Sequence, residues 1–136
     1  MKNIFLLLFL FTSVSSLSQE LSCFDFKEGS FYSPSDKAYD KVVLIKRSRN
    51  TQTETVKTEA GIKKIYAKIT WIDDCTYRLV YDDSKMKLDE IEMKVNSYNG
   101  IVVRHLDFEK NCVNYEATLT KTNGQQVIHT GKICLQ

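Results

Sequence analysis

Short runs that alternate apolar and polar residues recur about every ten positions from residue 42 to the end of the chain. In residues 91–96, Ile, Met and Val alternate with Glu, Lys and Asn, which would place the three apolar side chains on one face of a strand. We predict strands at residues 42–48, 51–58, 62–72, 76–81, 91–96, 101–108, 112–120 and 125–135. Helical structure is predicted only as single turns at residues 34–39 and 85–93. Many short strands at regular spacing are typical of an all-β protein.

Turn-forming pairs separate several of these strands. Asn99-Gly100 and Asn123-Gly124 are pairs preferred in two-residue hairpin loops, where both residues need a positive φ. Arg49-Asn50 and Asp73-Asp74 mark two further reversals. Reversals between successive strands predict an antiparallel meander of eight or nine strands, which either closes as a small up-and-down barrel or folds as a sandwich. We favour the barrel, because closure leaves no exposed edge strand.

The first eighteen residues differ from the rest of the chain. Lys2 precedes an unbroken apolar run at residues 4–11, and Ser16 and Ser18 occupy the −3 and −1 positions of a cleavage site before Gln19. This order is typical of a secretory signal peptide, and the apolar run is shorter than the ~20 residues of a spanning helix. We therefore predict a signal peptide at residues 1–18 and a single β-barrel domain at residues 19–136. We expect an exported monomer, periplasmic or extracellular, without a stable membrane anchor.

The charge of the chain is nearly balanced, with 19 Lys and Arg against 17 Asp and Glu and a formal net charge of +2. Proteins specialised for nucleic acids usually show a strong basic excess. We therefore interpret the basic clusters at residues 46–49 and 63–64 as solvated strand ends. A phosphate-binding loop and a dinucleotide fingerprint are both absent from the sequence. We expect neither a nucleic-acid partner nor a cofactor.

Four cysteines in a short exported chain predict two disulfides. If the last hairpin has a two-residue loop, Cys112 lies one residue out of register with Cys134, and a bulge at Gly131 would bring the two opposite each other. We therefore predict Cys112–Cys134 and, by elimination, Cys23–Cys75. The chain has no C-x-x-C motif, so the cysteines are not expected to bind zinc.

Groups that could perform catalysis are few. Only His105 and His129 could act as the general base of a hydrolase, and the sequence has no G-x-S-x-G motif. We interpret both histidines as solvent-facing or hydrogen-bonded strand residues. The acidic residues between positions 82 and 90 lack the spacing of a calcium loop. The sequence therefore favours a protein that is not an enzyme and holds no metal.

Three aromatic residues, Trp71, Tyr77 and Tyr81, fall on two consecutive predicted strands. With a three-residue loop at Asp73-Asp74, Trp71 faces Tyr77, and Ala67 faces Tyr81 on the same side of the sheet. This group either fills the core, which is the more common outcome, or lines one end of a small apolar cavity that binds a ligand. Both interpretations stay open.

Two segments carry a likeness to other proteins: Cys23-Phe24-Asp25-Phe26-Lys27 with Gly29 and Phe31, and Trp71-Ile72-Asp73-Asp74-Cys75 with Tyr77, Leu79 and Tyr81. They resemble a group of short exported bacterial β-rich proteins of unknown function, and the likeness includes the Cys23 and Cys75 pair. Proteins of this group are sometimes called DNA topoisomerase IV, but this chain has no ATP-binding loop and is too short for that activity. The meander also resembles lipocalin-type barrels without the Gly-x-Trp of a typical lipocalin, which is an analogy of fold alone.

These observations lead to two expectations for function. The first is an exported, non-enzymatic β-barrel that binds a small apolar ligand or a partner protein. The alternative is an envelope-associated inhibitor or accessory interaction protein that acts through loops such as residues 82–89. A hydrolase is the least favoured hypothesis, because so few side chains could serve as its general base.

Overall fold

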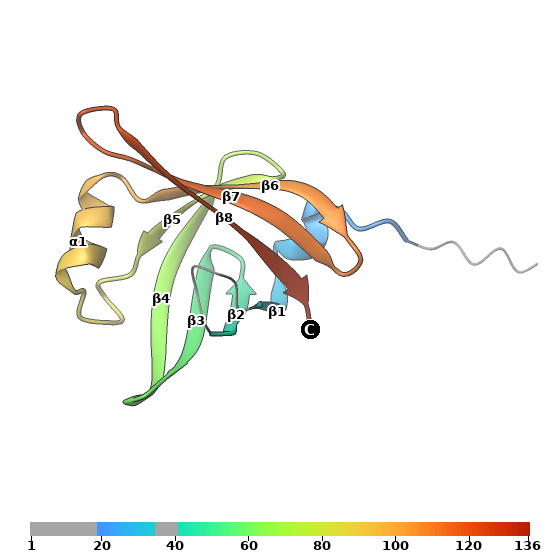
Figure 1. Cartoon of the computed structure of the whole chain (residues 1–136), viewed down its shortest axis with the longest axis horizontal. Helices are drawn as coiled ribbons and strands as arrows, with labels where there is room; N and C mark the ends of the chain where they lie inside the picture. Colours follow the sequence, from blue (N-terminus) through green and yellow to red (C-terminus); the bar gives the residue numbers. More distant parts are fainter. Residues whose placement is uncertain (1–18, 35–40) are drawn as a thin grey trace, which may run out of the picture.

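Eight antiparallel strands form a closed barrel in the computed structural model, which describes residues 19–34 and 41–136 (Figure 1). The strands are β1 (Gly29–Ser33), β2 (Val43–Ser48), β3 (Thr51–Thr58), β4 (Gly61–Trp71), β5 (Thr76–Tyr81), β6 (Ile101–Glu109), β7 (Cys112–Thr120) and β8 (Gln126–Leu135). Each strand pairs with its successor, and β1 pairs with β8 to complete the barrel. The prediction of a small up-and-down barrel is confirmed. The predicted signal peptide, and all but the first residue of the turn at 34–39, lie outside the described residues.

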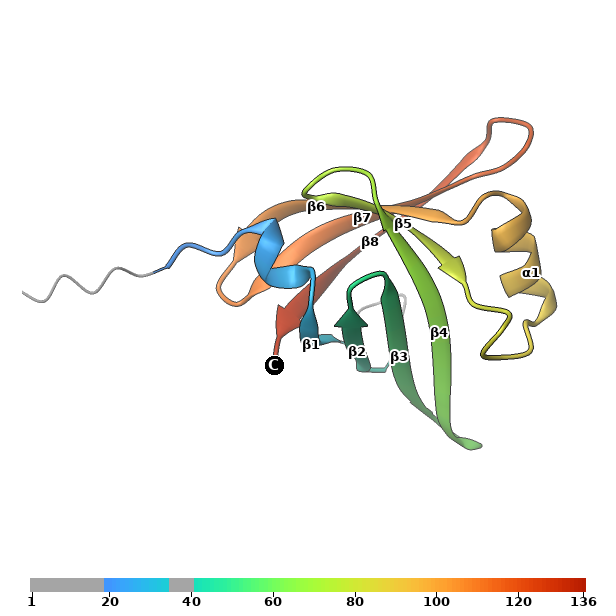
Figure 2. The same ribbon diagram turned by 180° about the vertical axis from the view of Figure 1, so that it is seen from behind.

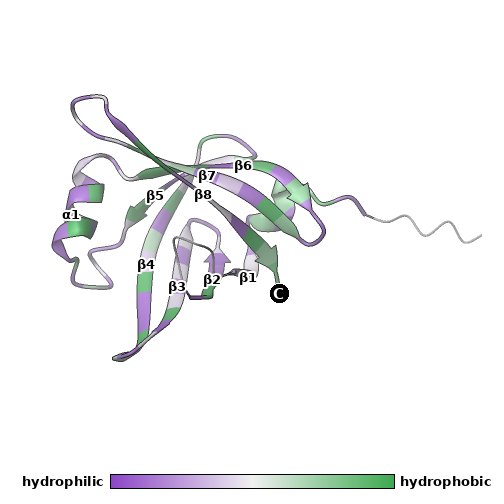
Figure 3. Cartoon of the chain, in the orientation of Figure 1, coloured by the Kyte–Doolittle hydropathy of each residue, from purple (hydrophilic) through white to green (hydrophobic). Residues whose placement is uncertain are grey.

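The strand predictions hold for seven of the eight strands, and β1 is the strand that we did not predict. The register at the Asp73-Asp74 turn is also as expected, because Trp71 pairs with Tyr77 and Ala67 pairs with Tyr81. Figure 3 shows the alternation of hydrophobic and hydrophilic positions along the strands. The alternation follows from the two-residue period of a strand, which turns one face toward the interior.

Residues 91–96, predicted as a strand, instead lie in α1 (Glu90–Ser97). The Asp89 side chain accepts a hydrogen bond from the Glu92 backbone N–H at 2.8 Å, and the Glu92 carboxylate accepts one from the Asp89 N–H at 2.9 Å. This capping box starts a helix, and a ninth strand would have no free edge to pair with in a closed barrel. Asn99-Gly100 has the expected positive φ values, but the pair ends α1 instead of forming a hairpin.

The last hairpin also differs from the prediction. The Lys121 N–H donates to the Gln125 carbonyl at 2.8 Å, so the loop contains three residues, 122–124, and not two. This shifts the register by one position and places Cys112 directly opposite Cys134, without a bulge at Gly131. Both predicted disulfides, Cys112–Cys134 and Cys23–Cys75, are present.

The two ends of the barrel are built differently, as Figures 1 and 2 show from opposite sides. At the end that we call the η1 end, the short helix η1 (Cys23–Phe26) lies across the barrel, and its Cys23 is bonded to Cys75 in the β4–β5 loop. The α1 end carries α1, the β3–β4 hairpin tip and the β7–β8 hairpin tip (Figure 1). Phe26 is fully buried at the η1 end and packs with Phe31, Ile45, Val113 and Ile133.

Candidate functional site

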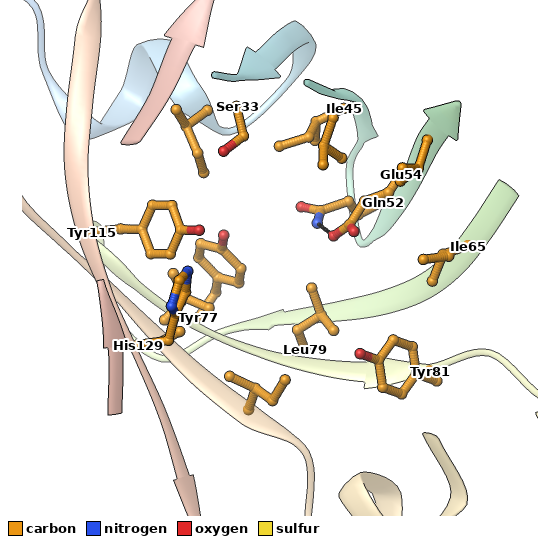
Figure 4. Close-up of a pocket in the computed structure, with 16 residues that line it drawn as sticks. Ser33, Ile45, Gln52, Glu54, Ile65, Tyr77, Leu79, Tyr81, Tyr115 and His129 are labelled. Carbon is orange, nitrogen blue, oxygen red and sulfur yellow. Dashed lines mark hydrogen bonds between the residues drawn. The ribbon is translucent and has the colours of Figure 1, made fainter. Parts of the chain in front are cut away.

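A cavity of about 220 Å³ lies inside the barrel, and residues from all eight strands line it (Figure 4). Most of its wall is aliphatic, with Ile45, Leu79 and Val103 among the contributors. A cavity of ~150 Å³ can hold benzene, whereas drug-sized ligands occupy pockets of ~300–1,000 Å³. This interior therefore has room for a single ring or a short chain.

A buried arginine separates the cavity from the η1 end. Arg47 is only 2% exposed, and it lies on β2 two residues after Ile45, so both side chains point inward. Its guanidinium donates hydrogen bonds to the Phe26 carbonyl and the Gln52 side-chain oxygen, each at 2.7 Å, and to the Tyr77 hydroxyl. Its charge also lies 4.7 Å from the centre of the Tyr77 ring. Mainly neutral groups thus satisfy this buried charge. The hydrogen bond to the Phe26 carbonyl also holds η1 in place.

Glu54 continues this polar chain into the cavity. Gln52 receives the hydrogen bond from Arg47 and donates one from its amide nitrogen to Glu54 Oε1 at 2.7 Å. Gln52 and Glu54 share the inward face of β3 because they are two residues apart. Burial raises the pKa of the Glu54 carboxyl above its ordinary value, and Gln52 and the Arg47 charge oppose this shift in part. Glu54 is therefore a carboxyl group held at the wall of a mainly apolar cavity.

The three predicted aromatic residues divide between the cavity and the η1 end. Tyr77 and Tyr81 line the cavity, with Tyr77 nearer to Arg47. Burial is the main reason that the pKa of the Tyr77 hydroxyl is raised, so this group stays protonated. Trp71 lies outside the cavity lining: its ring packs 4.9 Å from that of Tyr77, and the Lys27 ammonium lies 5.0 Å from its centre.

His105 contradicts the expectation of a solvent-facing or hydrogen-bonded side chain. It is 4% exposed, and neither ring nitrogen has a hydrogen-bond partner. Edge-on contacts with Phe26, Trp71 and Tyr77 surround it. Burial, with a contribution from the Arg47 charge, lowers the pKa of His105 to about 4. His105 shares the inward face of β6 with Val103, and this parity was the signal in the sequence for its burial.

His129 lies on β8 and, unlike His105, lines the cavity. Its ring lies 6.2 Å from that of Tyr115, measured between ring centres. Tyr115 pairs with Gly131 across the sheet, and a Cβ atom at Gly131 would stand 2.6 Å from the Tyr115 ring carbon that bears the hydroxyl. Gly131 therefore makes room for Tyr115 in the wall.

The polar residues of the interior are not predicted by the sequence pattern. Arg47 was assigned to a solvated strand end, and this prediction is wrong, because the side chain is buried. Gln52 and Glu54 were not singled out at all. Their spacing with Val56 would have placed all three on one face of β3, but nothing in the spacing says that this face is the interior.

Among residues 19–34 and 41–136, no three His, Cys, Asp or Glu side chains come together as a group able to hold a metal ion. Neither helix in the same part of the chain has the length and apolar character needed to cross a bilayer.

The chain was also compared with known proteins. No protein-family model, no curated protein and no solved structure matches it. The cavity and its side chains are therefore the features of this chain that bear on its function.

Proposed function

We propose that this protein is a non-enzymatic binding module that holds a small, mainly apolar ligand inside its barrel. The observation that carries the proposal is the cavity of about 220 Å³ with a mostly aliphatic and aromatic wall. Removing apolar surface of a ligand from water would supply the main driving force for binding. The ligand would enter from the α1 end, because η1 and the buried Phe26 cover the other end.

The surroundings of His105 support a binding role over hydrolysis at this residue. A general base needs a hydrogen-bonded route to the proton that it removes. His105 contacts three aromatic rings and has no hydrogen-bond partner on either nitrogen, so it lacks the orienting acid of a hydrolytic triad.

Toluene is a suitable probe for the proposed function, because it has the size of the cavity and no polar group. We expect it to shift the backbone NMR signals of residues that line the cavity, such as Leu79 and Val103. Ala117→Phe fills the cavity from β7 and should abolish these shifts, whereas Thr118→Phe on the other face of the same strand should keep them. Absence of toluene binding, or unchanged binding in Ala117→Phe, would refute the proposal.

We also propose that the chain is exported to the periplasm or the extracellular space. The two disulfides support this, because disulfides persist in oxidising compartments. Fractionation of cells that produce the full chain should recover a disulfide-bonded protein outside the cytoplasm, and recovery of only reduced protein in the cytoplasm would contradict it.

A role as an interaction protein is the second candidate, supported by α1. Ile91 is 74% exposed on this helix, and Met93 is 51% exposed. The preceding loop is held in place by Asp82, whose carboxylate accepts hydrogen bonds from the backbone and hydroxyl of Ser84. A rigid element with exposed apolar side chains suits contact with a partner. Capture of an envelope protein that is lost in Ile91→Ser but kept in Ile62→Ser would favour this candidate; equal capture would count against it.

A further inference from the structure

The polar groups of the barrel interior are distributed unevenly. Among the described residues that line the cavity, Glu54 is the one carboxylate, and the lining contains no lysine or arginine. Figure 4 shows the Glu54 side chain extending from β3 toward the cavity, with His129 on the opposite side. The cavity therefore offers a ligand one carboxyl group at a defined place in its wall.

Arg47 is poorly placed to attract an anionic ligand. It does not line the cavity, and its hydrogen bonds go to Phe26, Gln52 and Tyr77. Gln52 stands between Arg47 and Glu54 and bonds to both. A carboxylate that entered the cavity would meet Glu54 and no lysine or arginine among the described lining residues, and burying an unpaired charge is costly.

Glu54 retains capacity to bind a donor. A carboxylate can accept about four hydrogen bonds, and Glu54 receives one from Gln52 among the described residues. The aliphatic wall would hold the rest of such a ligand, as Leu79 and Ile65 line the same cavity.

We propose that the cavity selects ligands whose polar end donates a hydrogen bond to Glu54, a primary amine above an alcohol, and that it rejects carboxylates. This inference depends on the proposed function and names the ligand class for the same cavity. An ammonium group is the best partner because it adds charge attraction to the hydrogen bond and offsets the desolvation of Glu54. An alcohol supplies the hydrogen bond without the charge.

Three compounds with the same eight-carbon chain test the proposal at pH 7.4: octylamine, octan-1-ol and octanoate. Calorimetry on the chain without substitutions should rank the amine first and the alcohol second, with octanoate binding roughly tenfold or more weaker than the amine. Octanoate binding as tightly as octylamine would overturn the inference. Because this series uses the natural chain, its result does not depend on whether a variant folds.

A pair of matched variants locates the selectivity. Glu54→Gln keeps the size of the side chain and its capacity to accept from Gln52, and should lower octylamine affinity by roughly tenfold. Glu116→Gln makes the same chemical change at a surface carboxylate that pairs with Arg104, and should leave the ranking unchanged. An unchanged amine preference in Glu54→Gln would refute the role of Glu54. Octanoate binding that is lost only when His129 is replaced would also refute it, because His129 would then determine which head group binds.

The toluene experiment separates this inference from the proposed function. If toluene binds but the three head groups do not differ, the cavity binds apolar ligands without the selectivity that we infer. If neither toluene nor any of the three octyl compounds binds, the proposed function fails and the inference fails with it.

Discussion

The two ends of the barrel interior differ in how closely their apolar side chains pack. At the η1 end, Phe26 is fully buried in a cluster of apolar side chains, and the Cys23–Cys75 disulfide ties η1 to the β4–β5 loop. Toward the α1 end, the aliphatic side chains line a cavity instead of closing it. Arg47 lies between the two regions and bonds to both, through the Phe26 carbonyl and the Gln52 side chain. Apolar side chains are therefore closely packed at one end, while a cavity remains toward the other.

The largest effect on the free energy of unfolding is expected when a core residue is replaced at each end. Phe26→Ala should lower the free energy of unfolding by about 4 kcal/mol, because it removes a fully buried ring from tight packing. Leu79→Ala should cost about 2 kcal/mol, because Leu79 lines the cavity and is packed by protein atoms on fewer sides. Urea unfolding of both variants measures the difference. A greater loss in Leu79→Ala would break the comparison.

The η1 end should also be the more sensitive to acid, because His105 is buried there without a hydrogen-bond partner. Its pKa is lowered to about 4 in the folded chain, while an unfolded histidine titrates near 6.5. Between these values the unfolded state binds more protons, so stability is lost as the pH falls from about 6.5 to about 4. We expect a loss of about 3 kcal/mol from this group.

Thermal unfolding across that pH range measures the effect, and His105→Phe should flatten it, since Phe fits among the same aromatic rings. Glu54 works in the opposite direction, because its raised pKa means that protonation favours the folded state as the pH falls. An equally steep pH dependence in His105→Phe would show that other groups cause it.

A smaller effect should follow from Gly131→Ala, which changes the wall of the cavity. The added Cβ atom would stand within 3 Å of three atoms of the Tyr115 side chain, so the ring must move. We expect a cost of about 1–2 kcal/mol and weaker ligand binding. In a Tyr115→Leu background the same substitution should cost much less. Equal costs in the two backgrounds would show that the close approach of Tyr115 is not the reason for glycine at this position.

The smallest effect is expected at the surface, where neither end of the interior is involved. Arg104 and Glu116 form an ion pair at 3.4 Å between neighbouring strands, and the Arg104 side chain is 59% exposed. Glu116→Gln should change stability by less than about 0.5 kcal/mol, because water screens exposed ion pairs. A larger loss in urea unfolding would show that this ion pair contributes more to stability than an exposed pair normally does.

Several features of the fold could be predicted from the sequence, because they depend on residues that are close together in the chain. The Asp73-Asp74 turn predicted that Trp71 faces Tyr77, and this register is confirmed. The signal for α1 was present as Asp89 followed by Glu92, but the alternation of apolar residues over a short run fits a strand equally well. A one-residue difference in the length of the last loop changed the expected register, although the disulfide prediction survived it.

Much less of the candidate site than of the fold could be predicted from the sequence. Arg47 belongs to a run of basic residues, and such runs usually face solvent. Its burial is possible only because Phe26, Gln52 and Tyr77 provide acceptors from three other parts of the chain. No local pattern carries that information, because the partners lie 5, 21 and 30 residues away.

By itself, then, the sequence determined the strand period, the Arg49-Asn50 and Asp73-Asp74 reversals and the antiparallel order of the strands, because each depends on local geometry or on the register of adjacent strands. The Cys112–Cys134 pair followed from the register of the last hairpin, and Cys23–Cys75 followed by elimination. The tertiary structure decided which face of each strand is the interior, how η1 covers one end, and that a cavity with Glu54 in its wall remains at the other. The reason is physical: cavity volume and the burial of polar groups depend on how eight strands and η1 pack together, and no single segment specifies that packing.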